Sequence, residues 1–248
     1  MVVGMESFIE KFRDYTDCYT VIGGAACDIL MSEADTEFRA TKDIDMILIL
    51  EDKYPEFAKL FWEYIKEADY TCGWRNSDSM HFYRFTEPKA GYPFMIELFS
   101  RKPGYHLEVD EGIIPIHIDD DTSSLSAILL NDDYYNFMLV GRTVVNGASV
   151  LSAEYLIPFK MYAWLDLKEK KKNGEHVNEK DLKKHKYDVF RLLQIVQNDA
   201  VIESTGLVRE SIDRFMIEIM EEEIPFTQIG LPFSKDEAME ILHEIYGV

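Results

Sequence analysis

An apolar run with two aspartates at its entrance constrains the fold of this chain most strongly. Residues 44–50 read IDMILIL, and every residue except Asp45 is apolar, which predicts a buried strand. Asp43 and Asp45 stand at the entrance of this strand. Because side chains alternate along a strand, both carboxylates face the same side, with Cα atoms about 7 Å apart. Two neighbouring carboxylates repel each other unless water or a positive group lies between them.

Two explanations fit this pair of aspartates. Both side chains could lie in a solvated loop, with Asp43 capping a turn. They could instead converge on a divalent cation, because magnesium prefers one or two carboxylates together with water and substrate phosphates. Glu97 is the only charged residue in the apolar run PFMIELF at 93–99, so it either lies at an edge or is bound to something. Three carboxylates from two strands could hold two metal ions, the arrangement that supports in-line phosphoryl transfer.

The pattern of the chain changes near residue 120. We expect an α+β domain at 1–120, followed by an all-helical domain at 121–248. The final helix begins with a capping box, in which Ser234 is followed three residues later by Glu237. The expected strands are 19–22, 44–50, 80–85, 94–99 and 113–118, and the expected helices include 7–15, 25–31, 55–68, 155–168, 181–198 and 211–220.

Composition excludes several classes of protein. The chain has 248 residues, 47% of them hydrophobic, which indicates a packed globular protein. Its net charge of −20 argues against a protein that coats nucleic acid non-specifically. Three cysteines without a C-x-x-C pair predict thiols in a reducing compartment. No signal peptide or membrane span is visible, so we expect a cytoplasmic location.

A glycine pair precedes the aspartates. Gly23 and Gly24 lie between a predicted strand and a predicted helix. Glycine lets the backbone approach a phosphate, and a helix N-terminus offers N–H donors to it. A glycine pair alone is more often only a tight turn, so its significance comes from the order of strand, Gly-Gly, helix and Asp-x-Asp.

This order resembles the nucleotidyltransferase superfamily. The matching stretch is 21–48, VIGGAACDIL…FRATKDIDMIL, and the form GG…R-x-T-K-D-I-D is similar to the toxins of type IV abortive-infection systems, the AbiEii/AbiGii family. The resemblance covers residues 20–100. In the second half of the chain it is confined to 156–160 and 184–190.

The resemblance implies a mixed β-sheet core with flanking helices, a helical second domain, and transfer of a nucleoside monophosphate from a nucleoside triphosphate to an acceptor hydroxyl. It implies two Mg²⁺ ions, with Mn²⁺ as a substitute. The implied metal ligands are Asp43, Asp45 and Glu97, and the implied nucleotide-binding residues are Gly23, Gly24, Lys160 and Asp188.

The chain departs from the family pattern at two positions. Ala25 stands where many relatives carry Ser or Thr, so a hydroxyl contact to phosphate is missing. His185 replaces an acid of the second-half motif, and Asp181 could fill the role given to Asp188.

Several basic residues have two interpretations. Arg39 and Lys42 could reach the triphosphate or could neutralise nearby acids. Lys160 is the only charged residue between 155 and 165, so it must reach water along its stem or meet an anion. The run Lys168–Lys186 holds eight lysines and four acids, which suits either a solvated helix pair or an RNA approach.

The acceptor is left open by the sequence. The resemblance implies RNA such as tRNA, or a protein, for a toxin with a partner antitoxin. The alternatives are transfer to a small antibiotic-type molecule, and an inactive module of the same fold that binds nucleotide or protein.

Overall fold

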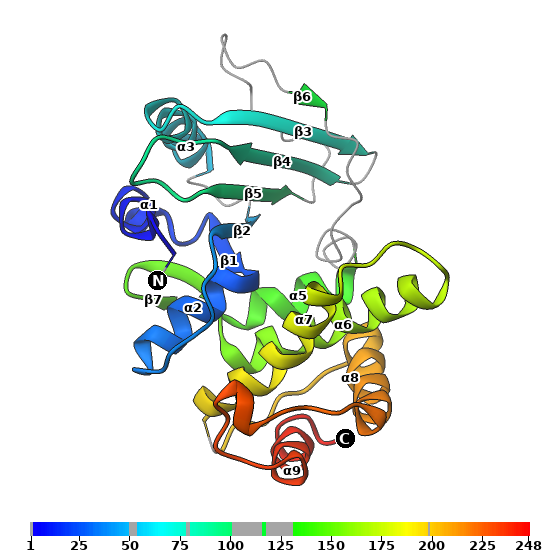
Figure 1. Ribbon diagram of the computed structural model, residues 1–248. Coiled ribbons are helices and arrows are strands. Elements are labelled where there is room, and N and C mark those ends of the chain that lie inside the picture. The colour runs from blue at the N-terminus through cyan, green and yellow to red at the C-terminus, as the bar shows by residue number, and fades with distance from the viewer. Residues whose placement is uncertain (1, 50–53, 78–79, 101–115, 118–130, 198) are drawn as a thin grey trace. The chain divides into compact units, whose positions relative to one another are not determined.

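The computed structural model describes residues 2–49, 54–77, 80–100, 116–117, 131–197 and 199–248, and it divides into two compact units (Figure 1). The first unit comprises Met1–Thr122 and Arg142–Leu151, and the second comprises Ser123–Gly141 and Ser152–Val248. The expected division into 1–120 and 121–248 therefore differs in one segment. Residues 142–151 form a β-hairpin that belongs to the first unit, so the chain after residue 121 is not all-helical.

The first unit is built on a mixed sheet, which confirms the expected α+β class. Its described strands form one eight-stranded sheet in the order β6-β3-β4-β5-β2-β1-β8-β7. The neighbours β2·β5, β1·β8 and β3·β6 are parallel, and the other pairs are antiparallel. The strands are β1 (Tyr19–Ile22), β2 (Asp43–Leu48), β3 (Thr71–Ser77), β4 (Met80–Thr86), β5 (Met95–Ser100), β6 (Ile116–His117), β7 (Arg142–Val145) and β8 (Ala148–Leu151).

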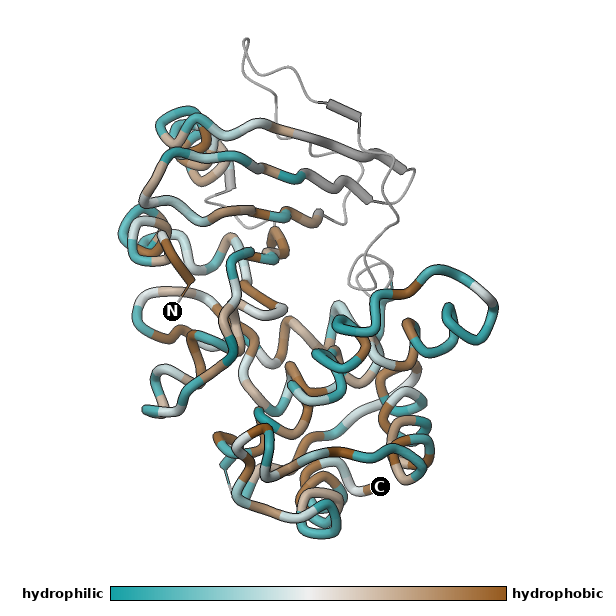
Figure 2. The backbone as a smooth tube through the Cα atoms, in the orientation of Figure 1, coloured by the Kyte–Doolittle hydropathy of each residue, from teal (hydrophilic) through white to brown (hydrophobic). Residues whose placement is uncertain are grey.

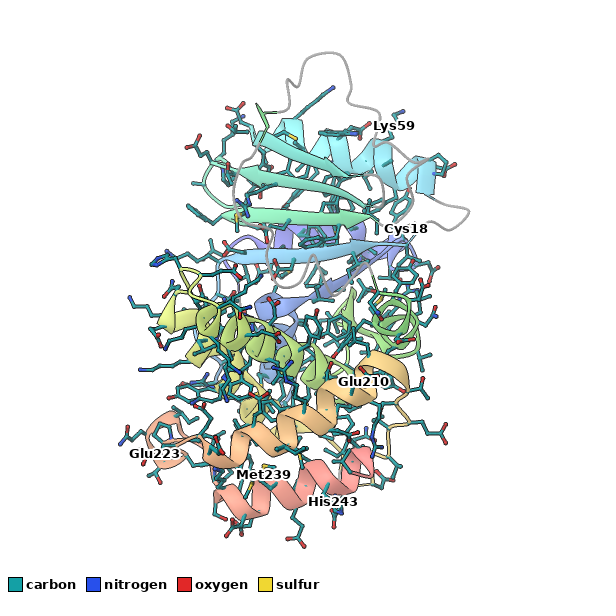
Figure 3. The ribbon with its side chains drawn as sticks, turned by 90° about the vertical axis from the view of Figure 1, so that its right-hand side faces the viewer. Cys18, Lys59, Glu210, Glu223, Met239 and His243 are labelled. Carbon is teal, nitrogen blue, oxygen red and sulfur yellow. The ribbon has the colours of Figure 1, made fainter. Side chains whose placement is uncertain are left out.

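An aromatic cluster fixes two helices of the first unit against the sheet. Helices α1 (Met5–Phe12) and α3 (Tyr54–Glu67) meet through Phe12 and Phe57, whose ring centroids are 5.5 Å apart. Phe57 also stacks on Tyr19 of β1 at 5.9 Å. All three rings are fully buried, so the helices and β1 share one core. Figure 3 marks α3 by Lys59 and the residue before β1 by Cys18.

The hairpin β7–β8 follows from a turn signal that the sequence analysis did not use. Asn146 and Gly147 connect the two strands with φ angles of 52° and 84°. Both central residues of a type I′ turn need positive φ, and Asn-Gly is the preferred pair for it. Strand β8 then pairs in parallel with β1, with Val150 opposite Val21. The hairpin thus continues the sheet on the far side of β1 from β2.

The described part of the second unit is helical. Its helices pack around α6, and Figure 3 labels Glu210 on α8 and both Met239 and His243 on α9. In α9 the predicted capping box of Ser234 and Glu237 is confirmed. None of the helices in the described ranges is long and apolar enough to cross a membrane. The helices are α5 (Asp132–Val140), α6 (Ala153–Lys172), α7 (Glu179–Leu192), α8 (Gly206–Glu218) and α9 (Lys235–Tyr246).

Helix α6 contains a proline in its interior. Pro158 has no N–H, so the carbonyl of Glu154 one turn earlier cannot accept the usual helical hydrogen bond. The hydroxyl of Tyr246, at the end of α9, donates to this carbonyl at 2.6 Å. Burial raises the pKa of Tyr246 well above its ordinary value. Helix α9 therefore supplies the hydrogen bond that the proline removes from α6.

Candidate active site

The two aspartates of β2 lie on one partly open face of the sheet. Asp43 and Asp45 are both partly exposed, whereas Ile44 and Met46 between and after them are fully buried. This alternation matches the period of a strand. The interpretation that both acids lie in a solvated loop is therefore wrong, because Asp43 and Asp45 are residues of the paired strand β2.

Strand register brings further site residues to Asp45. Asp45 lies opposite Ile22 of β1 on one side and opposite Glu97 of β5 on the other. Gly23, the first residue of α2 (Gly23–Glu33), has φ 68°. A Cβ on Gly23 would collide with the Asp45 carboxylate, so this position needs glycine for both conformation and space. The sheet thus gathers the glycine turn, Asp45 and Glu97 at one place.

The second glycine faces the segment that leads into β2. A Cβ on Gly24 would lie 2.7 Å from the hydroxyl oxygen of Thr41 and 3.5 Å from a guanidinium nitrogen of Arg39. The Arg39 guanidinium also lies over the ring of Phe38, 4.9 Å from its centroid. Arg39 therefore lies beside the start of α2, whereas Lys42 is exposed with its ammonium 5.8 Å from the centroid of Phe94.

Glu97 has a cationic partner within the sheet. The Nε of Arg84 donates to Glu97 Oε1 at 2.8 Å, and Arg84 lies opposite Glu97 in the β4·β5 register. The Glu97 side chain is 7% exposed and that of Arg84 is 22% exposed. Of the two explanations for an isolated charge in β5, binding to a partner is confirmed. The sequence analysis missed Arg84, because only the strand register shows that the two residues are opposite each other.

The carboxylates of Asp43 and Asp45 could hold a divalent cation. Asp43 and Asp45 form a pair of oxygen donors on one face, the donor set that Mg²⁺ prefers. In the part of the chain that the structure describes, no three His, Cys, Asp or Glu side chains are grouped closely enough to hold a metal. One carboxylate oxygen of Glu97 is held by the Arg84 guanidinium.

The two site residues expected from the second half of the chain bind each other. Lys160 is 2% exposed, and its Nζ donates to Asp188 Oδ2 at 3.2 Å. Arg191 donates to Asp188 Oδ1 at 3.3 Å, and Asp188 is fully buried. Of the two alternatives for Lys160, meeting an anion is the one observed. Asp181, the other candidate acid, lies in the first turn of α7 and is partly exposed.

The position of Lys160 in its helix corrects one expectation of the sequence analysis. A proline in the first helical turn would place Lys160 near the helix N-terminus. Helix α6 begins at Ala153, however, and Pro158 lies inside it. Lys160 is therefore two turns into the helix.

Ion pairs offset much of the basic run at 168–186. Figure 2 shows a largely hydrophilic connection between α6 and α7, and the eight lysines of the run lie on either side of it, at the end of α6 and in α7. Lys186 donates to Glu222 at 2.7 Å. Burial raises the pKa of Glu222, but the hydrogen bond and charge of Lys186 outweigh it, so the net pKa is lowered. The other carboxylate pairs of the run are Lys168–Glu218, Lys168–Glu222, Lys170–Asp166 and Lys171–Glu179.

Comparison with known proteins gives structural likenesses only. No family model and no curated protein matches the chain. A nucleotidyltransferase-like protein from Paracoccidioides brasiliensis is similar at 13% identity and TM-score 0.44, with 92% of this chain and 89% of that chain covered. The Megavirus polyadenylate synthase is similar at 13% identity and TM-score 0.41, with 89% of this chain but 36% of that chain covered.

A third similar structure is the antibiotic-resistance factor ANT(2'')-Ia, at 10% identity and TM-score 0.38, with 75% of this chain and 80% of that chain covered. At these identities and TM-scores the likenesses do not define a family for this chain.

Proposed function

We propose that this chain is a metal-dependent nucleotidyltransferase that moves a nucleoside monophosphate from a nucleoside triphosphate to an acceptor hydroxyl. The observation that carries the proposal is the register of the sheet. It places the Gly23 turn at the start of α2 directly against the carboxylate of Asp45, with Glu97 on the adjacent strand. A phosphate-binding turn and metal-binding carboxylates are the two parts that phosphoryl transfer from a nucleotide requires.

Each part has a separate chemical role in this proposal. The first-turn N–H groups of α2 would bind phosphate oxygens, and Arg39 beside Gly24 would add a positive charge. Asp43 and Asp45 would hold a divalent cation. When bound, such a cation lowers the pKa of an acceptor hydroxyl and offsets negative charge on the leaving pyrophosphate. Glu97, oriented by Arg84, would add a third carboxylate on the strand next to Asp45.

The finer identity of the reaction is also a proposal. An RNA or protein acceptor, and a toxin role with an antitoxin partner, follow from the resemblance of the R-x-T-K-D-I-D segment to the AbiEii/AbiGii family. The ion-paired state of several lysines between 168 and 186 favours an acceptor that does not depend on a broad basic surface. A hydroxylated small molecule of the antibiotic type fits this description as well.

One observation favours a second candidate function. Arg84 already occupies one oxygen of Glu97, and a cation in that position reduces the negative charge that a second metal ion would need. An inactive module that binds nucleotide through the glycine turn, with one metal ion or none, is consistent with this pairing.

Transfer of label from an α-³²P nucleoside triphosphate distinguishes the two functions. The protein is incubated with each of the four triphosphates and Mg²⁺ or Mn²⁺, against RNA, protein and aminoglycoside acceptors. The expected result is transfer by the wild type and none by Asp45→Asn, whose fold is checked by thermal melting. Nucleotide-dependent thermal stabilisation without transfer to any acceptor class would favour the inactive module. Transfer by Asp45→Asn at the wild-type rate would refute the assignment of Asp45 as a metal ligand.

A further inference from the structure

Three charged side chains form a row across neighbouring strands of the sheet. Arg84 of β4 lies opposite Glu97 of β5, and Glu97 lies opposite Asp45 of β2 (Figure 1). Residues opposite each other on paired strands point to the same face, and neighbouring strands are about 4.8 Å apart. Glu97 therefore lies between a guanidinium on one side and a carboxylate on the other. Its side chain can turn towards Arg84, or towards a cation held at Asp45.

The structure shows Glu97 turned towards Arg84. The Nε of Arg84 donates to Glu97 Oε1 at 2.8 Å, and both side chains are more buried than exposed. A charge-assisted hydrogen bond away from bulk water is strong, because little solvent competes for it. Asp43, Asp45 and Glu97 all lie within the described ranges, and no three His, Cys, Asp or Glu side chains there are grouped closely enough for a metal. The three acids therefore do not converge on one point.

Electrostatics oppose a metal ion at Glu97. A divalent cation bound to this carboxylate would lie next to the Arg84 guanidinium, and like charges so close repel each other. Arginine keeps its charge throughout the pH range in which proteins fold. Turning Glu97 away would also cost Arg84 this carboxylate partner in a largely buried place. Asp43 and Asp45, in contrast, are the pair of carboxylates that one Mg²⁺ takes together with water and substrate phosphate.

We propose that the site binds a single divalent cation through Asp43 and Asp45, and that Arg84 keeps Glu97 out of the ligand set of that cation. Arg84 is then a positioning residue, which acts on the metal site through Glu97. The inference rests on the proposed function only for the part that the cation plays in transfer. It departs from the family resemblance, which implies two ions and Glu97 as a ligand.

Binding of Mn²⁺ to the full chain, without nucleotide, tests this proposal. Electron paramagnetic resonance of free Mn²⁺ gives both the number of bound ions and their affinity. Asp45→Asn and Glu97→Gln are matched variants, because each changes one carboxylate into an amide of nearly the same shape. Arg84→Gln removes the cation that holds Glu97. Melting temperatures without metal show whether each variant is folded at the temperature of the titration.

The wild type should bind one Mn²⁺ that Asp45→Asn binds about tenfold or more weakly, because a charged ligand is lost. Glu97→Gln should bind this ion within about threefold of the wild type. Arg84→Gln should bind Mn²⁺ about threefold or more tightly, because a positive charge is removed and Glu97 is released.

Three results would overturn the inference. They are two bound ions or none in the wild type, a loss in Glu97→Gln as large as that in Asp45→Asn, and weaker binding in Arg84→Gln. The test is independent of transfer activity. One Mn²⁺ retained by Glu97→Gln, in a protein that transfers no label to any acceptor, would support the inference and refute the proposed function. Transfer of label by a wild type that binds two ions would refute the inference and support the proposed function.

Discussion

Replacing Lys160 by methionine should destabilise the second unit of this protein substantially. The Lys160 and Asp188 side chains are 3% and 0% exposed and are 3.2 Å apart. Removing one partner of a buried ion pair costs about 3–5 kcal/mol, because the other charge is left without compensation. Arg191 still donates to the second oxygen of Asp188, which reduces the penalty. We expect the free energy of unfolding to fall by about 2–4 kcal/mol.

A double-mutant cycle in urea measures this interaction. The variants are Lys160→Met, Asp188→Leu and the double variant, with coupling of about 1–3 kcal/mol expected between the two sites. The matched control is Lys168→Met on the same helix, whose ammonium pairs with carboxylates but whose side chain is 31% exposed. That variant should lose at most about 1 kcal/mol, as exposed ion pairs do.

Two results would contradict this reasoning. One is a Lys160→Met variant no less stable than Lys168→Met, and the other is additivity of the two substitutions at 160 and 188. Triphosphate affinity measured on the folded fraction of Lys160→Met then tests the phosphate contact that the family resemblance implies for this lysine.

Three further predictions follow from the site and from the second unit. Gly23→Ala should lower the free energy of unfolding by about 1–3 kcal/mol and abolish metal-dependent nucleotide binding, because the alanine Cβ would collide with Asp45. A variant with the melting temperature of the wild type would contradict this. Glu97→Gln should destabilise the metal-free protein by about 1–3 kcal/mol, since Arg84 loses its charged partner, and greater stability in chelator would show that carboxylate repulsion dominates. The pKa of Glu222 is lowered in the folded protein, so the stability that Glu222 contributes is present above its unfolded pKa near 4.3 and is lost as the pH falls through its folded pKa. The free energy of unfolding of Glu222→Gln should therefore change less between about pH 5 and pH 3 than that of the wild type.

Local patterns were sufficient to predict most elements of the first unit. The strand expected at 19–22 is β1, and the helix expected at 55–68 is α3 at Tyr54–Glu67. In each of these segments the spacing of apolar residues matches either the strand period or the helix period, but not both. Strand β3, Thr71–Ser77, was missed because its sequence TCGWRNS mixes glycine and polar residues without clear alternation. Such a strand is specified by its neighbours more than by its own residues.

The candidate site residues could be named from the sequence, but their contacts with other residues could not. Asp43, Asp45 and the glycine pair were identified from their order along the chain. The contacts of Arg84 with Glu97, and of Thr41 with Gly24, depend on strand register and on the path of a connecting segment. Neither is specified by spacing along the sequence. For the same reason the partner of Lys160 could be predicted as an anion but not as Asp188.

The position of β8 in the sheet has a consequence for protein synthesis. Strand β1 is paired on one side by β2, which follows it closely in the chain, and on the other by β8, which is translated roughly 125 residues later. At a translation rate of about 5–20 residues per second, this interval lasts roughly 6 to 25 s. During that time one edge of β1 has backbone donors and acceptors without their final partners, and an exposed edge of this kind pairs readily with other chains. The nascent protein should therefore be most sensitive to chaperone supply, and to collision with neighbouring nascent chains, until the β7–β8 hairpin has left the ribosome.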